Sequence, residues 1–509
     1  MNHWISVAVQ TPAHSSVAGP LTYRSELPLP PGTLVRAPLG SREVLGIVWS
    51  PADGPPDGRA AEATRTIAGA LEGIEPLSAP WLELVAFAAG YYQRALGELA
   101  LAALPPQLRE LSSTQLARRL KAGAGKPRDV SAGNAAGKSP DFIALSDQQT
   151  LALAEFESKP GPFLLFGATG SGKTEVYLHA VAALLERDPG AQALVMVPEI
   201  NLTPQLEARF NARFAPRYGD RSVVSLHSGM THPQRLKSWL AAHSGAARIV
   251  LGTRMAVFAS MPALRLIVVD EEHDPSYKQQ EGARYSARDL AVYRGRLDGA
   301  KVLLGSATPS LESWHHSRPA SVDDPGGRYT RLVMPGRIGD AGFPKVRRVD
   351  MNHQPMKTVF SAPLLDAIRA RVARGEQSMV FLNRRGYAPV LHCADCGWKS
   401  ECPHCSAFRV FHKIDRTLRC HHCGFTERVP RACPACGNID IAPLGRGTER
   451  LEEHLAELLE GDTRPDGTPI RIVRIDADTT KLKGALETQL AQVHSGEVDV
   501  LVGTQMIAK

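Results

Sequence analysis

Cysteine is absent from most of this 509-residue sequence, because all eight cysteines fall between Cys393 and Cys436. The opening residues MNHWISVAVQ lack the charged and then apolar pattern of an export signal. No apolar run approaches the roughly 20 residues that span a bilayer. Disulfide frameworks are typical of small exported chains. The sequence therefore predicts a cytoplasmic protein whose cysteines bind metal.

An excess of one charge sign is also missing. Lys and Arg number 59 and Asp and Glu number 52, which gives a net charge of +7. So mild an excess permits a polyanionic partner without requiring one. The length predicts about three or four domains.

The strongest signal present is the segment Phe163–Glu186, FLLFGATGSGKTEVYLHAVAALLE. Its apolar start predicts a buried strand and its end predicts a helix. Between them lies the phosphate-binding pattern G-x-x-x-x-G-K-[ST], formed by Gly167, Ala168, Thr169, Gly170, Ser171, Gly172, Lys173 and Thr174. Backbone N–H groups of such a loop converge on phosphates, the lysine reaches the β- and γ-phosphates, and the Thr hydroxyl binds Mg²⁺. We predict ATP and Mg²⁺ as cofactors.

Strand and helix patterns alternate from Asp141 to about Trp314, which predicts a parallel sheet covered on both faces. The strand Leu266–Val269 leads into Asp-Glu-Glu-His. We expect Asp270 to hold Mg²⁺, Glu271 to orient and deprotonate water, and His273 to relay between the nucleotide and other ligands. The alternative is a solvated acidic turn that caps a helix.

Other stretches of the chain carry weaker patterns. Residues 1–75 show short apolar segments between Pro- and Gly-rich turns, which indicates a small β domain. Residues 80–104 predict a helix. A second α/β unit begins with a helix at Ala362–Arg374 and a strand at Ser378–Phe381, and stops a few residues after a strand at Val498–Val502.

The cysteines form four C-x-x-C pairs, each able to supply half of a tetrahedral zinc site. The spacing of the inner pairs is near that of zinc ribbons, so Cys402, Cys405, Cys420 and Cys423 are expected to share one zinc. The outer residues Cys393, Cys396, Cys433 and Cys436 would share another. The alternative joins neighbouring pairs. Four thiolates leave no open coordination position, so both Zn²⁺ ions would be structural.

Together these pieces resemble the PriA family (primosomal protein N-prime), the replication-restart helicases of bacteria. The resemblance rests on the eight cysteines and on the strings GATGSGKTEVYL, VPEINLTPQ, HSGM, GTRMAVF, DEEHDPSYKQQEGARYSARDLA, LGSATPSLES, FLNRRGYAP, GRGTERLEEHL, RIDADTT and VLVGTQMIAK. It implies a superfamily 2, ATP-dependent DNA helicase and DNA-stimulated ATPase that moves 3′-to-5′. Implied DNA substrates are stalled forks, D-loops and single strands. Implied partners are primosome proteins, single-strand-binding protein and the loader of the replicative helicase.

The resemblance also assigns roles to residues outside the phosphate loop. Ser306, Ala307 and Thr308 match the motif that couples hydrolysis to movement, and Arg254 matches a contact to the DNA backbone. An aromatic-rich loop that contacts DNA is matched by Tyr277, Lys278, Arg284, Tyr285 and Arg288. Aromatic rings interleaved with cations suit base stacking and phosphate pairing. The alternative for the two tyrosines is a core aromatic pair.

The implied fold is α/β: a RecA-like helicase lobe and a partial second RecA-like lobe with an inserted double zinc ribbon, preceded by a small, mainly β, N-terminal DNA-binding domain. The expected domains are 1–105 (3′-end-binding), 106–140 (linker or vestigial winged helix), 141–315 (ATP-binding lobe), 316–360 (connector) and 361–509 (partial second lobe, with the insertion at 393–436).

Three features depart from the family pattern. The family's arginine-finger motif, whose arginine can be worth about 10³–10⁵ in turnover, would lie beyond Lys509, as would a C-terminal domain. The sequence is therefore expected to be truncated at its C-terminus. The interval 106–140 is too short for the family's winged helix, and Leu21-Thr22-Tyr23 stands where the 3′-end pocket often has an aromatic-Asp-Tyr string. An alternative function is an ATP-binding fork-DNA scaffold with little hydrolysis.

Overall fold

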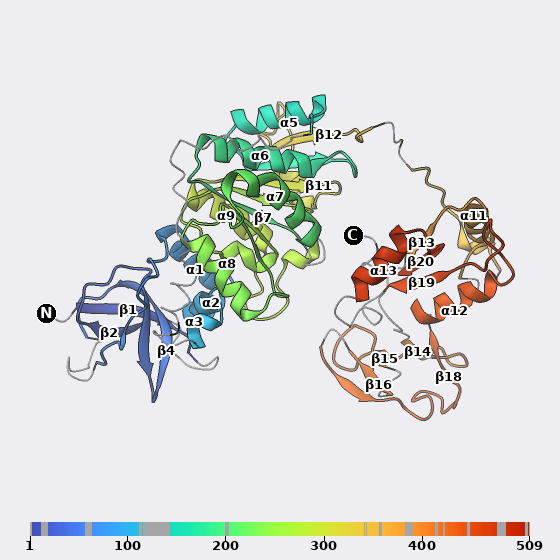
Figure 1. The fold of residues 1–509 in the computed structure, drawn as a ribbon. Helices are drawn as coiled ribbons and strands as arrows, with labels where there is room; N and C mark the ends of the chain where they lie inside the picture. Colours follow the sequence, from blue (N-terminus) through green and yellow to red (C-terminus); the bar gives the residue numbers. More distant parts are fainter. Residues whose placement is uncertain are drawn as a thin grey trace. The chain divides into compact units, whose positions relative to one another are not determined.

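The structure is a computed structural model of the chain (Figure 1). It describes residues 3–11, 19–55, 64–110, 115, 143–198, 203–339, 342, 344–355, 359–381, 390–412, 416–420, 423–444, 448–475, 485–503 and 507. Most of the predicted linker at 106–140 and the strings NRRGYAP and DADTT lie outside these residues. The chain divides into two compact units, Met1–Phe343 and Pro344–Lys509.

The first unit begins with a five-stranded antiparallel sheet of order β2-β1-β4-β3-β5. Its strands are β1 (His3–Val9), β2 (Leu21–Ser25), β3 (Leu34–Leu39), β4 (Arg42–Pro51) and β5 (Gly69–Ala70). Helices α1 (Ala79–Tyr91), α2 (Leu96–Ala102) and α3 (Gln107–Glu110) follow. The predicted helical stretch at 80–104 is therefore divided into two helices. The helix breaks after Tyr91, and Gln93 adopts a left-handed conformation with φ of 53°.

A seven-stranded parallel sheet forms the larger part of the first unit, with the order β12-β6-β11-β10-β7-β9-β8. Its strands are β6 (Phe163–Gly167), β7 (Gln192–Met196), β8 (Val223–Leu226), β9 (Ile249–Gly252), β10 (Leu264–Val269), β11 (Lys301–Ser306) and β12 (Thr330–Met334). Nearly every residue of the central strands is buried, which is why they appear in the sequence as continuous apolar runs.

Helices cover both faces of this sheet. They are α5 (Asp147–Ser158), α6 (Lys173–Arg187), α7 (Thr203–Tyr218), α8 (His232–His243), α9 (Ala287–Asp298) and the short α10 (Leu311–His316). One core joins α5, α6 and α7 to side chains such as Phe163 and Leu165. The opposite core joins α8 and α9 to Leu164, Leu304 and their neighbours, and it also includes residues of α1. The predicted doubly covered parallel sheet is confirmed.

Strand β12 differs from the prediction, which placed residues 330–334 inside an irregular connector. It pairs in parallel with β6, from Thr330 opposite Phe163 to Met334 opposite Gly167. The sequence obscures this strand because Arg331 and Val333 alternate with the buried Leu332 and Met334, and Pro and Gly flank it on both sides. An edge strand that is buried on one side gives only a weak apolar signal.

The second unit contains a three-stranded parallel sheet of order β13-β20-β19. Its elements are α11 (Ala362–Val372), β13 (Ser378–Phe381), α12 (Thr448–Leu458), β19 (Ile472–Ile475), α13 (Ala485–His494) and β20 (Val500–Gly503). Between β13 and α12 the chain forms short antiparallel strands, namely β14 (Val390–Cys393), β15 (Val410–His412), β16 (Thr417–Arg419), β17 (Thr426–Arg428) and β18 (Ile441–Leu444). The cysteines lie in this insertion. None of the described helices is long and apolar enough to cross a membrane.

Candidate functional site

The phosphate loop lies between the end of β6 and the start of α6. Gly170 and Gly172 have φ values of 83° and 78°. This left-handed backbone conformation is readily adopted by glycine and disfavoured for other residues. A Cβ at Gly172 would also collide with the side-chain amide of Gln149. The Lys173 ammonium is nearly buried and donates to the Gly167 carbonyl at 3.1 Å. The glycines let the backbone of this loop curl, and phosphate binding by the loop and Lys173 stays a prediction.

Gln149 supports this loop, and the sequence analysis missed it. Its Nε2 donates to the carbonyls of Ser171 (3.3 Å) and Gly172 (3.2 Å). Its Oε1 accepts from the Ser146 N–H at 2.8 Å as part of a capping box at the start of α5. The string Ser-Asp-Gln-Gln carries the capping signal, but it does not reveal which loop the amide will reach.

Asp270 follows β10 and lies near the start of α6. Its Oδ1 accepts hydrogen bonds from the Tyr177 hydroxyl (2.9 Å) and from the Glu271 N–H (3.1 Å). Burial raises the pKa of Asp270 to about 6, and the charge of Glu271 acts in the same direction, while Tyr177 and Lys173 oppose it. This half-buried carboxylate, which interacts electrostatically with Lys173, is a suitable ligand for a divalent cation.

Glu271 and His273 connect this carboxylate to the end of β11. Glu271 has a φ of 45°, an uncommon backbone conformation for this residue type, and its Oε2 lies 3.6 Å from His273 Nδ1. The same Nδ1 lies 2.8 Å from Ser306 Oγ, and His273 Nε2 lies 3.3 Å from Thr308 Oγ1. One imidazole therefore touches both strand-end motifs that the sequence singled out.

Glu272 is a further residue that the sequence analysis left without a role. Its buried carboxylate accepts from the Ser310 N–H at 2.7 Å, from the Ser310 hydroxyl at 3.0 Å and from the Ser313 hydroxyl at 2.9 Å. Arg288 Nη1 lies 3.4 Å from the same carboxylate. Glu272 therefore anchors the start of α10 to the turn after β10, next to His273.

Two predicted DNA contacts are corrected by the structure, and DNA contact by Arg288 stays a prediction. The rings of Tyr277 and Tyr285 are only 2% and 8% exposed and belong to the core, so the core alternative describes them. Tyr277 donates its hydroxyl to the Asp270 carbonyl at 2.7 Å. Arg288 pairs internally with Asp289 and with the Ser310 hydroxyl. The loop sequence is polar, but its tyrosines pack into the core, where Tyr285 contacts Phe258, and no local pattern shows this.

The other three predicted DNA contacts, Arg254, Lys278 and Arg284, are half-buried or exposed. Arg254 donates through Nη1 to the carbonyls of Ser276 (2.8 Å) and Lys278 (3.1 Å), so it holds the loop that follows the carboxylates. The side chains of Lys278 and Arg284 are exposed on that loop. DNA contact by Arg254, Lys278 and Arg284 stays a prediction.

The insertion brings the eight cysteines together in two groups of four. One group is Cys393, Cys396, Cys433 and Cys436, and the other is Cys402, Cys405, Cys420 and Cys423. Sulfur atoms within a group lie 3.4–3.7 Å apart in the closest pairs. Four thiolates at 2.3 Å from a tetrahedral zinc would be about 3.8 Å apart. The geometry fits the nested arrangement.

Glycines shape the turns around these sulfurs. Gly397, Gly424 and Gly437 have φ values of 75°, 82° and 78°. Each donates its N–H to the carbonyl of the cysteine four residues earlier: Cys393, Cys420 and Cys433. The tight turns direct two thiolates of a pair to the same side, which is what a shared metal needs.

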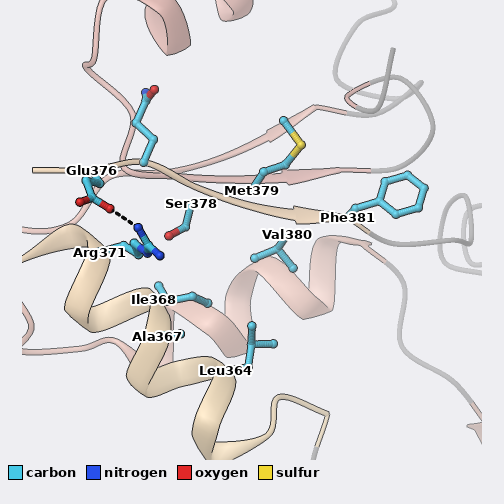
Figure 2. A pocket seen from close by; sticks show the side chains of 10 residues that line it. Leu364, Ala367, Ile368, Arg371, Glu376, Ser378, Met379, Val380 and Phe381 are labelled. Atoms are coloured by element: carbon cyan, nitrogen blue, oxygen red, sulfur yellow. Dashed lines mark hydrogen bonds and ion pairs between the residues drawn. The ribbon is translucent and has the colours of Figure 1, made fainter. Parts of the chain in front are cut away.

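A hollow of about 420 Å³ lies in the second unit between α11 and β13 (Figure 2). Val380 points toward α11, and the charged groups at one end, Arg371 and Glu376, pair with each other at 2.6 Å. Since its charged groups already have partners and no catalytic residue lines it, we assign it no ligand.

The phosphate loop follows one strand of the sheet, and the acidic motif follows another. His273 joins the acidic motif to the end of a third strand. This arrangement defines the ATP-binding lobe of a helicase. A family profile described as DEAD/DEAH box helicase matches residues 146–316. Two profiles specific to one family also match: the 3′DNA-binding domain (3′BD) of PriA at residues 6–105, and the PriA DNA helicase Cys-rich region (CRR) domain at residues 402–428.

Curated relatives agree with these profiles. A Replication restart protein PriA of Rickettsia conorii is 34% identical over 499 residues, which cover 96% of this chain and 70% of that protein. One from Haemophilus influenzae is 42% identical over 369 residues, covering 72% and 48%. One from Bacillus subtilis is 40% identical over 380 residues, covering 73% and 44%. The chain belongs to the PriA family of replication restart proteins. It spans about half the length of the last two relatives.

Proposed function

We propose that the chain is an ATP-dependent DNA helicase of replication restart that moves 3′-to-5′, recognises stalled forks and D-loops, and initiates primosome assembly in the cytoplasm. The observation that carries the proposal is the bridge made by His273. It joins the carboxylate motif after β10 to Ser306 and Thr308 after β11. Such a bridge lets a change at the nucleotide shift the residues that follow β11.

The chain's own residues perform distinct parts of the proposed reaction. The phosphate loop and Lys173 would bind the triphosphate, and Asp270 and Thr174 would hold Mg²⁺, which would neutralise charge on the phosphates. Glu271 is exposed enough to orient a water and accept its proton. The primosome proteins, single-strand-binding protein and helicase loader remain proposed partners because they rest on family membership.

Strand displacement tests the proposal. Partial duplexes that permit only 3′-to-5′ or only 5′-to-3′ travel are incubated with the chain, ATP and Mg²⁺. We expect displacement only of the strand that 3′-to-5′ movement reaches, and none when ATP is omitted. Displacement with the opposite polarity, or equal displacement without ATP, would contradict the proposal.

We also propose that each cysteine group holds one structural Zn²⁺. Metal analysis of the purified chain is expected to give two equivalents, and Cys402→Ser and Cys396→Ser should each lower the content to one. Strong chelators should unfold the insertion, since structural zinc supplies folding free energy of about 10 kcal/mol or more. Loss of both ions on a single substitution would contradict two independent sites.

A further inference from the structure

Residues 278–286 form a loop that is attached at one end to the catalytic carboxylates. Tyr277, just before the loop, donates its hydroxyl to the Asp270 carbonyl at 2.7 Å. Arg254 fixes the carbonyls of Ser276 and Lys278. A displacement of this loop therefore acts on the backbone that carries Asp270.

The other side of the same loop is held by the end of α1, which belongs to the N-terminal domain. The Ser286 N–H donates to the Tyr92 hydroxyl at 3.0 Å, and Arg94 Nη2 donates to the Gly282 carbonyl at 2.8 Å. The Lys278 ammonium lies 5.2 Å from the centre of the Tyr92 ring, within cation–π range. Two side chains that directly follow α1, Tyr92 and Arg94, thus set the position of a loop almost two hundred residues away.

Helix α1 is firmly seated on the lobe. The buried Trp81 indole donates to the Phe258 carbonyl at 2.8 Å. The rings of Phe87 and Tyr293 stack with centroids 3.9 Å apart. These contacts fix the body of α1 on the lobe. A movement of the N-terminal sheet relative to the lobe must therefore be taken up by the residues that follow α1.

That segment leads directly into the β domain. Helix α2 packs on β1 and β4, and Gly97 lies so close to β1 that a Cβ would collide with the Val9 carbonyl oxygen. Packing this tight transmits a shift of β1 into α2 rather than absorbing it. A continuous series of contacts therefore runs from the N-terminal sheet through α2, Tyr92 and the loop to Asp270.

We propose that Tyr92 and Arg94 are positioning residues that couple DNA bound at the N-terminal domain to the nucleotide site. They do so by holding the 278–286 loop in place, and with it the preceding Tyr277, whose hydroxyl donates to the Asp270 carbonyl. This inference rests on the proposed function, because it needs ATP at the phosphate loop and DNA on the N-terminal domain. Neither side chain touches the nucleotide-binding residues.

The test compares matched variants of the full chain. Tyr92→Phe keeps the ring and removes the oxygen that accepts from Ser286, and Tyr91→Phe is its control because Tyr91 is exposed and lies on the same helix. Arg94→Ala removes the bond to Gly282. Arg94→Lys keeps the positive charge and should retain part of the coupling between DNA and nucleotide. Glu98→Gln removes only the neighbouring negative charge, which lies 3.9 Å from Arg94.

Two readouts are measured: forked-DNA affinity with and without a non-hydrolysable ATP analogue, and ATP hydrolysis with and without saturating DNA. Coupling between two ligands is reciprocal, so either ligand reports it. We expect Tyr92→Phe with Arg94→Ala to lower the DNA stimulation of hydrolysis about five- to tenfold. The effect of the analogue on DNA affinity should fall in parallel. DNA affinity without nucleotide and hydrolysis without DNA should stay within twofold of the unchanged chain.

The outcomes separate this inference from the proposed function. If the unchanged chain couples the two ligands and the double variant couples them equally well, the inference is wrong and the proposed function stands. If the double variant loses DNA affinity without nucleotide by the same factor, its role is only structural and the inference is also wrong. If the unchanged chain binds no ATP analogue, both fail.

Discussion

Replacing Lys173 with alanine is expected to lower ATP turnover by at least about 10²–10³-fold, the loss seen when one preorganised donor to a developing charge is removed. Lys173 is 9% exposed and its ammonium lies 3.1 Å from the Gly167 carbonyl, at the base of the phosphate loop. No other lysine side chain among the described residues hydrogen-bonds to this loop. The measurement is phosphate release with saturating DNA.

The matched control is Lys237→Ala, because Lys237 is an exposed lysine on α8 of the same lobe. Its turnover should equal that of the unchanged chain. The melting temperature of Lys173→Ala should lie within a few degrees of the unchanged chain, which separates lost catalysis from lost folding. If Lys173→Ala kept more than about a tenth of the turnover, the loop would not be the site of hydrolysis.

Replacing Glu271 with glutamine is expected to lower turnover by about 10²–10⁴-fold and to leave ATP affinity nearly unchanged, since a general base contributes that much to the chemical step. The amide has the size of the carboxylate but cannot accept a proton from water. Glu271 lies beside Asp270 but faces His273, 3.6 Å away, so the loss should fall on the chemical step rather than on binding.

Glu157→Gln serves as the control, because Glu157 is an exposed glutamate on α5 of the same lobe. ATP affinity is measured with a fluorescent analogue and turnover by phosphate release. An equal loss of affinity and turnover in Glu271→Gln would give Glu271 a binding role. Unchanged turnover would remove it from the mechanism.

Much of the fold is predictable from the sequence because buried parallel strands are continuous apolar runs. The strands at Phe163 and Ser378 begin at the predicted residues, and the phosphate loop pattern lies directly after the first of them. The parallel sheet of the first unit brings the carboxyl ends of β10 and β11 to the same edge as the phosphate loop after β6. Asp270, His273 and Ser306 meet there for that reason.

The remaining features depend on contacts that no local pattern contains. Tyr277 is buried because Asp270 offers it a carbonyl, and Arg254 holds the backbone beside it. Gln149 reaches the phosphate loop, and Tyr92 meets Ser286, only after the chain folds. Strand β12 lies at the edge of the sheet, where only Leu332 and Met334 of its five residues are buried, so its sequence shows only part of the apolar run of a central strand. Apart from Tyr277 and Asp270, which are seven residues apart, the deciding partners are distant in sequence.

The most direct test of the account is the rate of ATP hydrolysis by the intact 509-residue chain, measured with Mg²⁺ in the presence and absence of single-stranded DNA. If nucleotide chemistry at the end of β6 is coupled to DNA, the rate should rise at least about tenfold with DNA. An ATP-binding chain whose hydrolysis is negligible, or equally fast with and without DNA, would contradict the helicase and favour a fork-binding scaffold.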